Sequence, residues 1–357
     1  MVEVNDSMGK NWLPKEKTFK RTVPLLIVGL LIFVVYLYFF VDLPELLTAF
    51  QQINIWYYLL AVAGVMINLV TYSLTWQYLL KPLSIKVGFK TTLLISWVGN
   101  FVEFFVPSES IGEDVSKSYL MAKASKENAG KAIASVLGQR IISMLVTVII
   151  LVACAVSLFF MNFEIPASVS FLIFLISVGT VIPLLFIVLL CKKEKLSHKI
   201  IDLLIRFCVW VARGRLNLED LREKAKNSLE SFHHSMGILA KNPKILILPL
   251  VFSLISYFFS VLVSYFVFAS LGYFNISFVL LTIVYSLSRS FQSIPTMLPG
   301  EVGFLEIVMT SLYIALLGPQ ASAISAASTV LTRVLWVWLK VLLGFGALQW
   351  AVRKQLI

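Results

Sequence analysis

Long apolar runs separated by short polar stretches dominate this chain. An α-helix needs about 20 apolar residues to cross the hydrocarbon core of a bilayer. The runs that reach this length predict six full crossings, at residues 23–41, 56–80, 132–160, 168–190, 245–271 and 321–352. We therefore expect an all-α polytopic membrane protein.

Two further apolar segments, 91–123 and 277–317, are each interrupted near the middle. The first break reads Pro-Ser-Glu-Ser-Ile-Gly-Glu-Asp (107–114) and the second reads Pro-Thr-Met-Leu-Pro-Gly-Glu (295–301). Each half is short for a crossing, so we expect two re-entrant helical hairpins, the first entering from the cytoplasm and the second from outside. Irregular backbone at that depth is tolerated where it is buried in protein or lines a water-filled cavity.

This order of elements predicts an inverted repeat, with one copy at 23–160 and the other at 161–354. Each copy has the order span, span, hairpin, span. Both breaks share the pattern Pro-x-x-x-x-Gly-Glu, and the span after each carries an arginine, Arg140 in the first copy and Arg333 in the second. Transporters built from inverted repeats with broken helices bind their substrates near the bilayer midplane.

The loops predict the orientation. Loops 42–55 and 161–167 contain acidic residues and no Lys or Arg, whereas loops 81–90, 123–131 and 192–244 and the end at 353–354 are basic. Lys and Arg accumulate in cytoplasmic loops. We expect both the segment 1–22 and the C-terminus to be cytoplasmic, in a protein of the plasma membrane.

Loop 192–244 has the only sequence typical of a soluble segment, and residues 218–240 predict an amphipathic helix. Its basic side chains could rest on anionic lipid headgroups. A solvated linker helix whose charge only sets the topology is an equal alternative.

The composition supports a membrane protein and narrows the chemistry. The chain is 59% hydrophobic and 14% charged, with a mean hydropathy of +0.89. The net charge of +11 lies in loops, so we expect membrane lipids and no nucleic acid as partners. No nucleotide-binding loop, catalytic triad or metal-binding spacing is present, and the adjacent His233 and His234 are predicted to lie on the surface. We expect no enzyme activity, no cofactor and no metal.

The two breaks contain candidate binding groups. Ser110, Gly112 and Glu113 lie in a stretch with the spacing of a capping box, so a helix start with exposed amide donors could bind an anion there. Pro299 suits the first position of a helix, and Gly300 permits close approach of the backbone.

Charged residues inside the apolar segments are the other candidates, because charges at such depth usually face a partner or a wet cavity. Arg140, Arg289 and Arg333 could bind a phosphate-bearing headgroup through paired hydrogen bonds. Snorkelling to the interface explains a single arginine better than three. The coupling or helix-capping candidates are Glu113, Asp114, Lys117, Glu301 and Glu306. For Glu113 and Glu301, complementing a helix N-terminus is as plausible as protonation or ligand binding.

The segments 107–123 and 295–313 resemble the signature stretches of the lysylphosphatidylglycerol synthase transmembrane-region family, also called flippase-like or UPF0104 proteins. Gly112, Glu113 and Lys117 match the first stretch, although serines replace its glycines. Leu298-Pro299-Gly300, Gly303 and Glu306 match the second, with Glu301 where glycine is common. The resemblance spans about residues 22–354 and implies a stand-alone member without the synthetase domain, and a homodimer.

A lipid flippase that moves an anionic or phosphate-bearing headgroup between leaflets is the leading functional hypothesis. An intramembrane transferase acting on a lipid-linked substrate and a non-transporting envelope-assembly partner are the alternatives.

Overall fold

The computed structural model of the 357-residue chain describes residues 27–28, 30–39, 41, 43–105, 111–160, 167–211, 218–292 and 298–356. Every regular element in these ranges is helical. The elements are α2 (Leu43–Gln51), α3 (Ile55–Leu80), α4 (Phe89–Phe105), α5 (Ile111–Ser125), α6 (Ala129–Phe160), α7 (Ala167–Lys192), α8 (Glu194–Val211), α9 (Leu218–Lys241), η1 (Pro243–Leu246), α10 (Ile247–Ser270), α11 (Phe278–Phe291), η2 (Pro299–Glu301), α12 (Phe304–Leu317), η3 (Pro319–Ala321), α13 (Ser322–Arg333), η4 (Val334–Leu339) and α14 (Lys340–Arg353).

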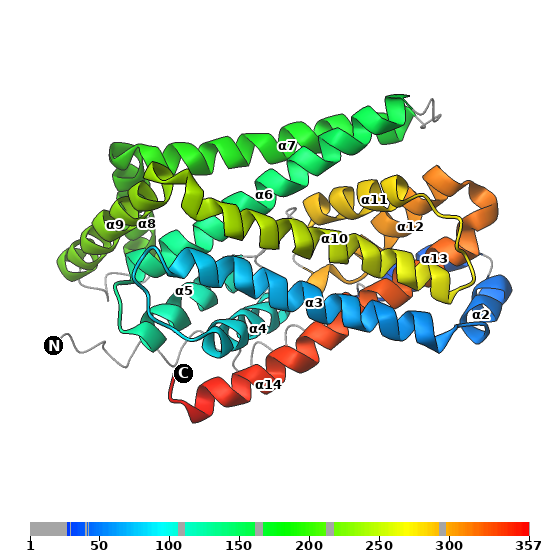
Figure 1. The fold of residues 1–357 in the computed structure, drawn as a ribbon, viewed down its shortest axis with the longest axis horizontal. Helices are drawn as coiled ribbons and strands as arrows, with labels where there is room; N and C mark the ends of the chain where they lie inside the picture. The colour runs from blue at the N-terminus through cyan, green and yellow to red at the C-terminus, as the bar shows by residue number, and fades with distance from the viewer. Residues whose placement is uncertain are drawn as a thin grey trace.

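The long helices run along the long axis of an elongated bundle (Figure 1). Helices α3 and α10 lie side by side at its centre and contact each other. Helices α6 and α7 flank this pair on one side, and α14 lies on the other side against α4.

Six helical runs are long and apolar enough to cross a membrane. Five coincide with predicted crossings: Ile55–Leu80, Ala129–Cys154, Val169–Cys191, Pro243–Ser270 and Pro319–Arg353. The all-α polytopic fold is therefore confirmed. The first predicted crossing, 23–41, is described only in part. Its helical portion Leu30–Phe39 is followed by Pro44–Gln51 at an angle of 109°, so the two together form at most one bent span.

The sixth run, Pro299–Leu317, lies where a hairpin arm was expected. It joins the short helix η2 to α12, and α12 alone has 14 residues. At 1.5 Å per residue α12 is about 21 Å long, shorter than the ~30 Å hydrocarbon core. The 14 residues of α11, 15 of α5 and 17 of α4 give similarly short helices.

The two pairs of short helices occupy opposite halves of the bundle. Helices α4 and α5 lie in the half that contains α9, and α11 and α12 lie in the half that contains α2 (Figure 1). Hairpins entering from opposite sides of the membrane would be arranged in this way. The turning points, 106–110 and 293–297, lie outside the described residues, so the re-entrant path stays a prediction.

Contacts between the two halves of the chain are reciprocal. Helix α6, at the end of the first predicted repeat, contacts α11 of the second, and α14, at the end of the second, contacts α4 of the first. Close approach of α14 to α4 requires Gly344, because a Cβ atom there would lie 2.6 Å from the Trp97 carbonyl oxygen. A two-fold axis would generate such a pattern. The inverted repeat and its boundaries stay predictions.

The predicted amphipathic helix at 218–240 is confirmed as α9, and it docks on the bundle. One face of α9 buries Leu229, Phe232 and Leu239, and the helix contacts α6. Helix α8, which precedes it, was not predicted. His233 was expected on the surface, which was wrong. It is buried, and its Nδ1 lies 3.1 Å from the Cys191 carbonyl oxygen.

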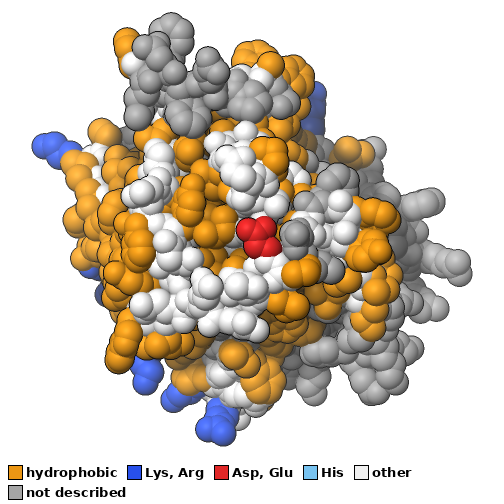
Figure 2. Space-filling model, turned by 90° about the vertical axis from the view of Figure 1, so that its right-hand side faces the viewer, with side chains coloured by type: hydrophobic (Ala, Val, Ile, Leu, Met, Phe, Trp, Pro, Cys, Tyr) orange, Lys and Arg blue, Asp and Glu red, His pale blue; other side chains and the backbone are white. Residues whose placement is uncertain are grey.

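The two ends of the bundle differ in charge. The basic loop at 81–88, the helices α8 and α9 and the end of α14 share one end (Figure 1). Figure 2 shows the opposite end, where hydrophobic and neutral polar side chains surround an acidic spot and Lys and Arg lie only at the rim. This asymmetry is the pattern on which the predicted orientation rests.

We predict that Gly130→Ala weakens the docking of α9 on α6. A Cβ atom at position 130 would lie 1.9 Å from the Ser228 carbonyl oxygen, so backbone must shift. Elsewhere in a helix, glycine-to-alanine substitution stabilises by up to about 1 kcal/mol. We expect a lower Tm for Gly130→Ala in detergent, measured by circular dichroism.

The matched control is Gly179→Ala in α7, where a Cβ atom meets nothing within 4 Å. Its Tm should be unchanged or higher. Equal effects of the two substitutions would contradict the close contact between α6 and α9.

Candidate functional site

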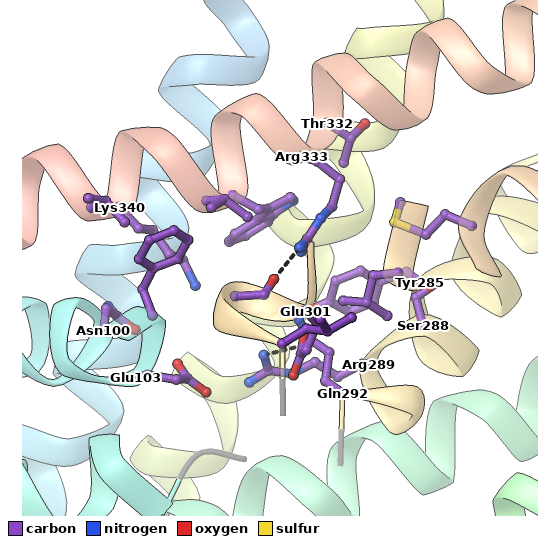
Figure 3. A pocket seen from close by; sticks show the side chains of 18 of the residues that line it. Asn100, Glu103, Tyr285, Ser288, Arg289, Gln292, Glu301, Thr332, Arg333 and Lys340 are labelled. Carbon is purple, nitrogen blue, oxygen red and sulfur yellow. Dashed lines mark hydrogen bonds between the residues drawn. The ribbon is translucent and has the colours of Figure 1, made fainter. Parts of the chain in front are cut away.

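A cavity of about 130 Å³ lies between the two broken segments, and we call it the first cavity. Its wall is built by α4, α10, α11, η2, α12 and the continuous run from α13 to α14. The lining residues are Asn100, Glu103, Phe104, Ser264, Tyr285, Ser288, Arg289, Gln292, Leu298, Gly300, Glu301, Leu305, Met309, Thr332, Arg333, Trp336, Val337, Lys340 and Val341. Figure 3 shows charged side chains converging on this space from opposite walls.

The first cavity lies near half depth in the bundle. In the 35-residue run Pro319–Arg353, Arg333 is fourteen residues from the beginning and Lys340 is thirteen residues from the end. Residues at these positions of a spanning helix lie in the hydrocarbon region. The cavity therefore concentrates charge where charge is most costly.

The run Pro319–Arg353 is not a uniform α-helix at the cavity. Residues Val334–Leu339 form a π-helix, which contributes Trp336 and Val337 to the wall. Single π-helical turns within α-helices are rare and are frequent at functional sites.

A buried ion pair holds the second break in place. The Arg333 Nε donates to Glu306 Oε1 at 2.8 Å, and both side chains are 8% exposed. The guanidinium also donates to the Gly300 carbonyl oxygen. Glu306 Oε2 in turn accepts from the Gly303 amide at 2.7 Å, which caps the start of α12. Glu306 is thus the carboxylate that complements this helix N-terminus.

The backbone of the break touches α4 at Gly300. Its φ is +57°, and a Cβ atom there would lie 2.5 Å from Cδ2 of Phe104. Only glycine fits such a conformation and approach without strain. Pro299 begins η2. The expected close approach at Gly300 is therefore confirmed. Pro299 begins only a short 3-10 turn, because the backbone of Gly300 is not helical, and the α-helix of this arm, α12, begins at Phe304.

Two other cations in the first cavity are less fully paired than Arg333. Arg289 donates to Gln292 Oε1 at 3.0 Å. Lys340 Nζ lies 4.8 Å from the centre of the Trp336 ring, and no carboxylate of the described residues forms a salt bridge with it. Glu103 lies on the α4 side of the cavity, near Arg289 and Lys340 (Figure 3).

A second, smaller cavity of about 70 Å³ adjoins the first. The two share six lining residues, namely Asn100, Glu103, Tyr285, Arg289, Trp336 and Lys340. The second cavity adds Glu113 from α5, and hydroxyl and amide side chains from α3, α6 and α10.

Behind the second cavity, Lys117 is fully buried and fully compensated. Its Nζ lies 3.3 Å from Glu113 Oε1 and 2.8 Å from Gln139 Oε1. The ammonium also lies 4.9 Å from the Tyr72 ring centre and 4.8 Å from the Trp76 ring centre. Because each neighbour favours the charged form, this network serves to hold α5 against α3 and α6.

The structure brings together part of the predicted site. Arg289, Arg333, Gly300 and Glu301 line the first cavity, and Glu113 lines the second. Pro299, Lys117 and Glu306 line neither cavity. Gly112, Arg140 and Asp114 line neither cavity. The Nη1 atom of Arg140 lies 2.5 Å from Oδ2 of Asp114. Ser110 lies outside the described residues.

Sequence reasoning missed Lys340, Asn100, Tyr285 and Gln292. Lys340 carried a usable signal, because it is a lone lysine inside the last apolar run, seven residues and two helical turns after Arg333. The neutral residues carried no usable signal, since Asn, Gln and Tyr are ordinary in helices that pack together in membranes.

Within the described ranges, no group of three His, Cys, Asp or Glu side chains is placed to hold a metal ion.

These features define a polytopic helical membrane protein with a charged cavity between broken segments. A model of the family described as lysylphosphatidylglycerol synthase TM region matches residues 26–344, and the chain belongs to this family.

Similar proteins are known from archaea. A UPF0104 membrane protein of Pyrococcus horikoshii is 26% identical over 93% of this chain and 98% of its own length. One of Methanothermobacter thermautotrophicus is 24% identical over 86% of this chain and 88% of its own. A third, of Methanocaldococcus jannaschii, is 24% identical over 94% and 96%. No solved structure matches the chain.

We predict that Glu306→Ala destabilises the protein strongly. The substitution leaves Arg333 buried without its carboxylate and uncaps α12, and breaking a buried pair costs about 3–5 kcal/mol. The free energy of unfolding in detergent measures the effect. The double variant Glu306→Ala/Arg333→Leu should recover part of the loss, since no unpaired charge remains.

Arg222→Ala serves as the control, because its pair with Asp202 is half exposed, at 45% and 49%. Such pairs contribute less than about 1 kcal/mol. A loss for Glu306→Ala no larger than that of the control would contradict the role of the buried pair.

Proposed function

We propose that this protein is a lipid flippase, and that the first cavity binds the phosphate of an anionic lipid headgroup on its way between leaflets. The observation that carries the proposal is the convergence of Arg289, Arg333 and Lys340 on one cavity near half depth. A headgroup that crosses a bilayer needs such a polar binding site, because the surrounding hydrocarbon offers it no hydrogen-bond or ionic partner.

The donor set favours phosphate over other cargo. Arginine and lysine side chains have donors and no acceptors, whereas phosphate oxygens are acceptors. The planar guanidinium group of arginine can also donate two parallel hydrogen bonds to two phosphate oxygens at once. Lys340 is the most available of the three cations. Arg333 already binds Glu306 and Gly300, and Arg289 already donates to Gln292.

Family membership supports a lipid as the cargo, because the family is named after the membrane region of a lipid synthase. Loops rich in Lys and Arg at one end of the bundle support a cytoplasmic location for that end. The proposed location is the plasma membrane, with the C-terminus inside.

The proposal is tested by lipid movement in proteoliposomes that contain the purified protein and fluorescent phosphatidylglycerol. We predict that Lys340→Met slows translocation about tenfold or more, because a hydrogen bond to a charged group contributes about 1.5–3 kcal/mol. Lys340 has no salt bridge to a described carboxylate, so its removal breaks no direct ion pair between described residues, and Arg289 remains near Glu103.

Two matched substitutions complete the test. Lys81→Met removes an exposed lysine that lies over the Tyr78 ring, and it should leave translocation unchanged. Arg140→Met removes an arginine that lines neither cavity, and its effect should be smaller than that of Lys340→Met. The proposal fails if folded wild-type protein moves no phosphate lipid, or if Lys340→Met moves lipid as fast as wild type.

A further inference from the structure

The second cavity has a different chemistry from the first, although the two adjoin. Ten of its seventeen lining residues carry a hydroxyl or a side-chain amide: Asn68, Tyr72, Asn100, Ser143, Thr147, Ser253, Ser256, Tyr257, Ser260 and Tyr285. Only Leu69, Val146 and Trp336 are apolar. A cavity that served phosphate alone would not require this many neutral polar groups in the interior of a membrane bundle.

Some of these groups bind other parts of the protein. Asn68 donates at 2.8 Å to both the hydroxyl of Ser256 and that of Ser260, and so joins α3 to α10. Hydrogen bonds of this kind connect helices in many membrane proteins. Asn68, Ser256 and Ser260 are therefore structural.

Other groups are buried and have no partner in the described part of the chain. Asn100 is 9% exposed, lines both cavities and makes no side-chain hydrogen bond to a described residue. Ser253 is 6% exposed, lines the second cavity and likewise makes none. Ser288, in the wall of the first cavity, has a buried hydroxyl oxygen without a partner. Buried polar groups are nearly always satisfied by the protein or by ordered water. These three groups line the cavities, so they are available to a ligand there.

The type of the unpartnered groups indicates what they bind. An amide and a hydroxyl each both donate and accept, whereas phosphate only accepts and an ammonium only donates. They can therefore donate to a phosphate or accept from an ammonium, and a hydroxyl uses both capacities at once. The position of Asn100 in the wall common to both cavities places this recognition next to the cations of the first cavity.

We propose that the cargo is a phosphodiester lipid whose headgroup carries several hydroxyls, with its phosphate in the first cavity and its hydroxyls in the second. Glycerol, inositol and sugar headgroups share this chemistry. The inference rests on the proposed function and narrows its substrate class. Asn100 and Ser253 determine the specificity, and Arg289, Arg333 and Lys340 bind the phosphate.

The test compares lipids that differ only in their headgroups in the proteoliposome assay. Fluorescent phosphatidic acid has a phosphate alone, phosphatidylethanolamine adds an ammonium, and phosphatidylglycerol and phosphatidylinositol add hydroxyls. We expect wild-type protein to move the two hydroxyl-bearing lipids at least about fivefold faster than phosphatidic acid, the difference that one or two hydrogen bonds provide.

Asn100→Leu and Ser253→Ala should each reduce the ratio of phosphatidylglycerol movement to phosphatidic acid movement. Ser73→Ala is the control, because Ser73 is fully buried, bonds to the Leu69 carbonyl oxygen of its own helix and lines neither cavity. It should keep the preference of wild type. Gel filtration and thermal unfolding in detergent show whether the Asn100 and Ser253 variants are folded.

The outcomes separate the two proposals. Equal movement of all four lipids, or a preference that survives both substitutions, would overturn the hydroxyl site and leave the flippase proposal standing. Preferential movement of phosphatidylethanolamine would assign the second cavity to an ammonium through Glu103 and Glu113, which also overturns it. Movement of none of the lipids by folded wild-type protein would overturn the flippase proposal and this inference together.

Discussion

The interaction on which the site depends is the compensation of Arg333 inside the bundle. An isolated arginine in a hydrocarbon environment costs several kcal/mol. Here the guanidinium receives a carboxylate from Glu306 and a main-chain carbonyl from Gly300. In a continuous α-helix that carbonyl would be committed to its own helix. The break at Pro299 and Gly300 thus supplies an acceptor that an unbroken span could not.

The same constraint connects the break to the rest of the fold. Glu306 caps α12 while it binds Arg333, so the helix start, the ion pair and the run from α13 to α14 depend on one another. Gly300 places the break directly against Phe104 of α4. One wall of the first cavity is therefore held in place by contacts within the protein.

Buried polar groups that have hydrogen-bond partners within the protein stabilise the fold, whereas those with few partners are available to bind a ligand. Lys117 is the most buried cation of the described residues, yet Glu113, Gln139 and two aromatic rings compensate it completely. Lys340 and Asn100 lie nearby and have far fewer partners. If burial of charge were the only criterion, Lys117 would be the first candidate for ligand binding. The number of partners within the protein makes Lys340 and Asn100 better candidates.

The sequence predicted the spans well because the signal is strong, since a run of about 20 apolar residues has few other uses. It also predicted the close approach at Gly300, because the conformational freedom of glycine is intrinsic to the residue type. It could not predict which carboxylate pairs with which arginine. Glu301 and Glu306 are equally plausible on spacing, and only the path of the chain after Gly300 selects Glu306. Arg140 and Arg289 looked equivalent for the same reason, although only Arg289 reaches a cavity.

Photo-crosslinking with a phosphate lipid that carries a diazirine in its headgroup tests the central claim most directly. The protein is illuminated in lipid bilayers and the modified peptides are mapped by mass spectrometry. The account predicts adducts in the segments 285–292, 298–309 and 332–341, which contain lining residues of the first cavity. Competition with unlabelled lipid should remove these adducts. Adducts confined to the lipid-facing surface of α7 and to the basic loops would contradict it.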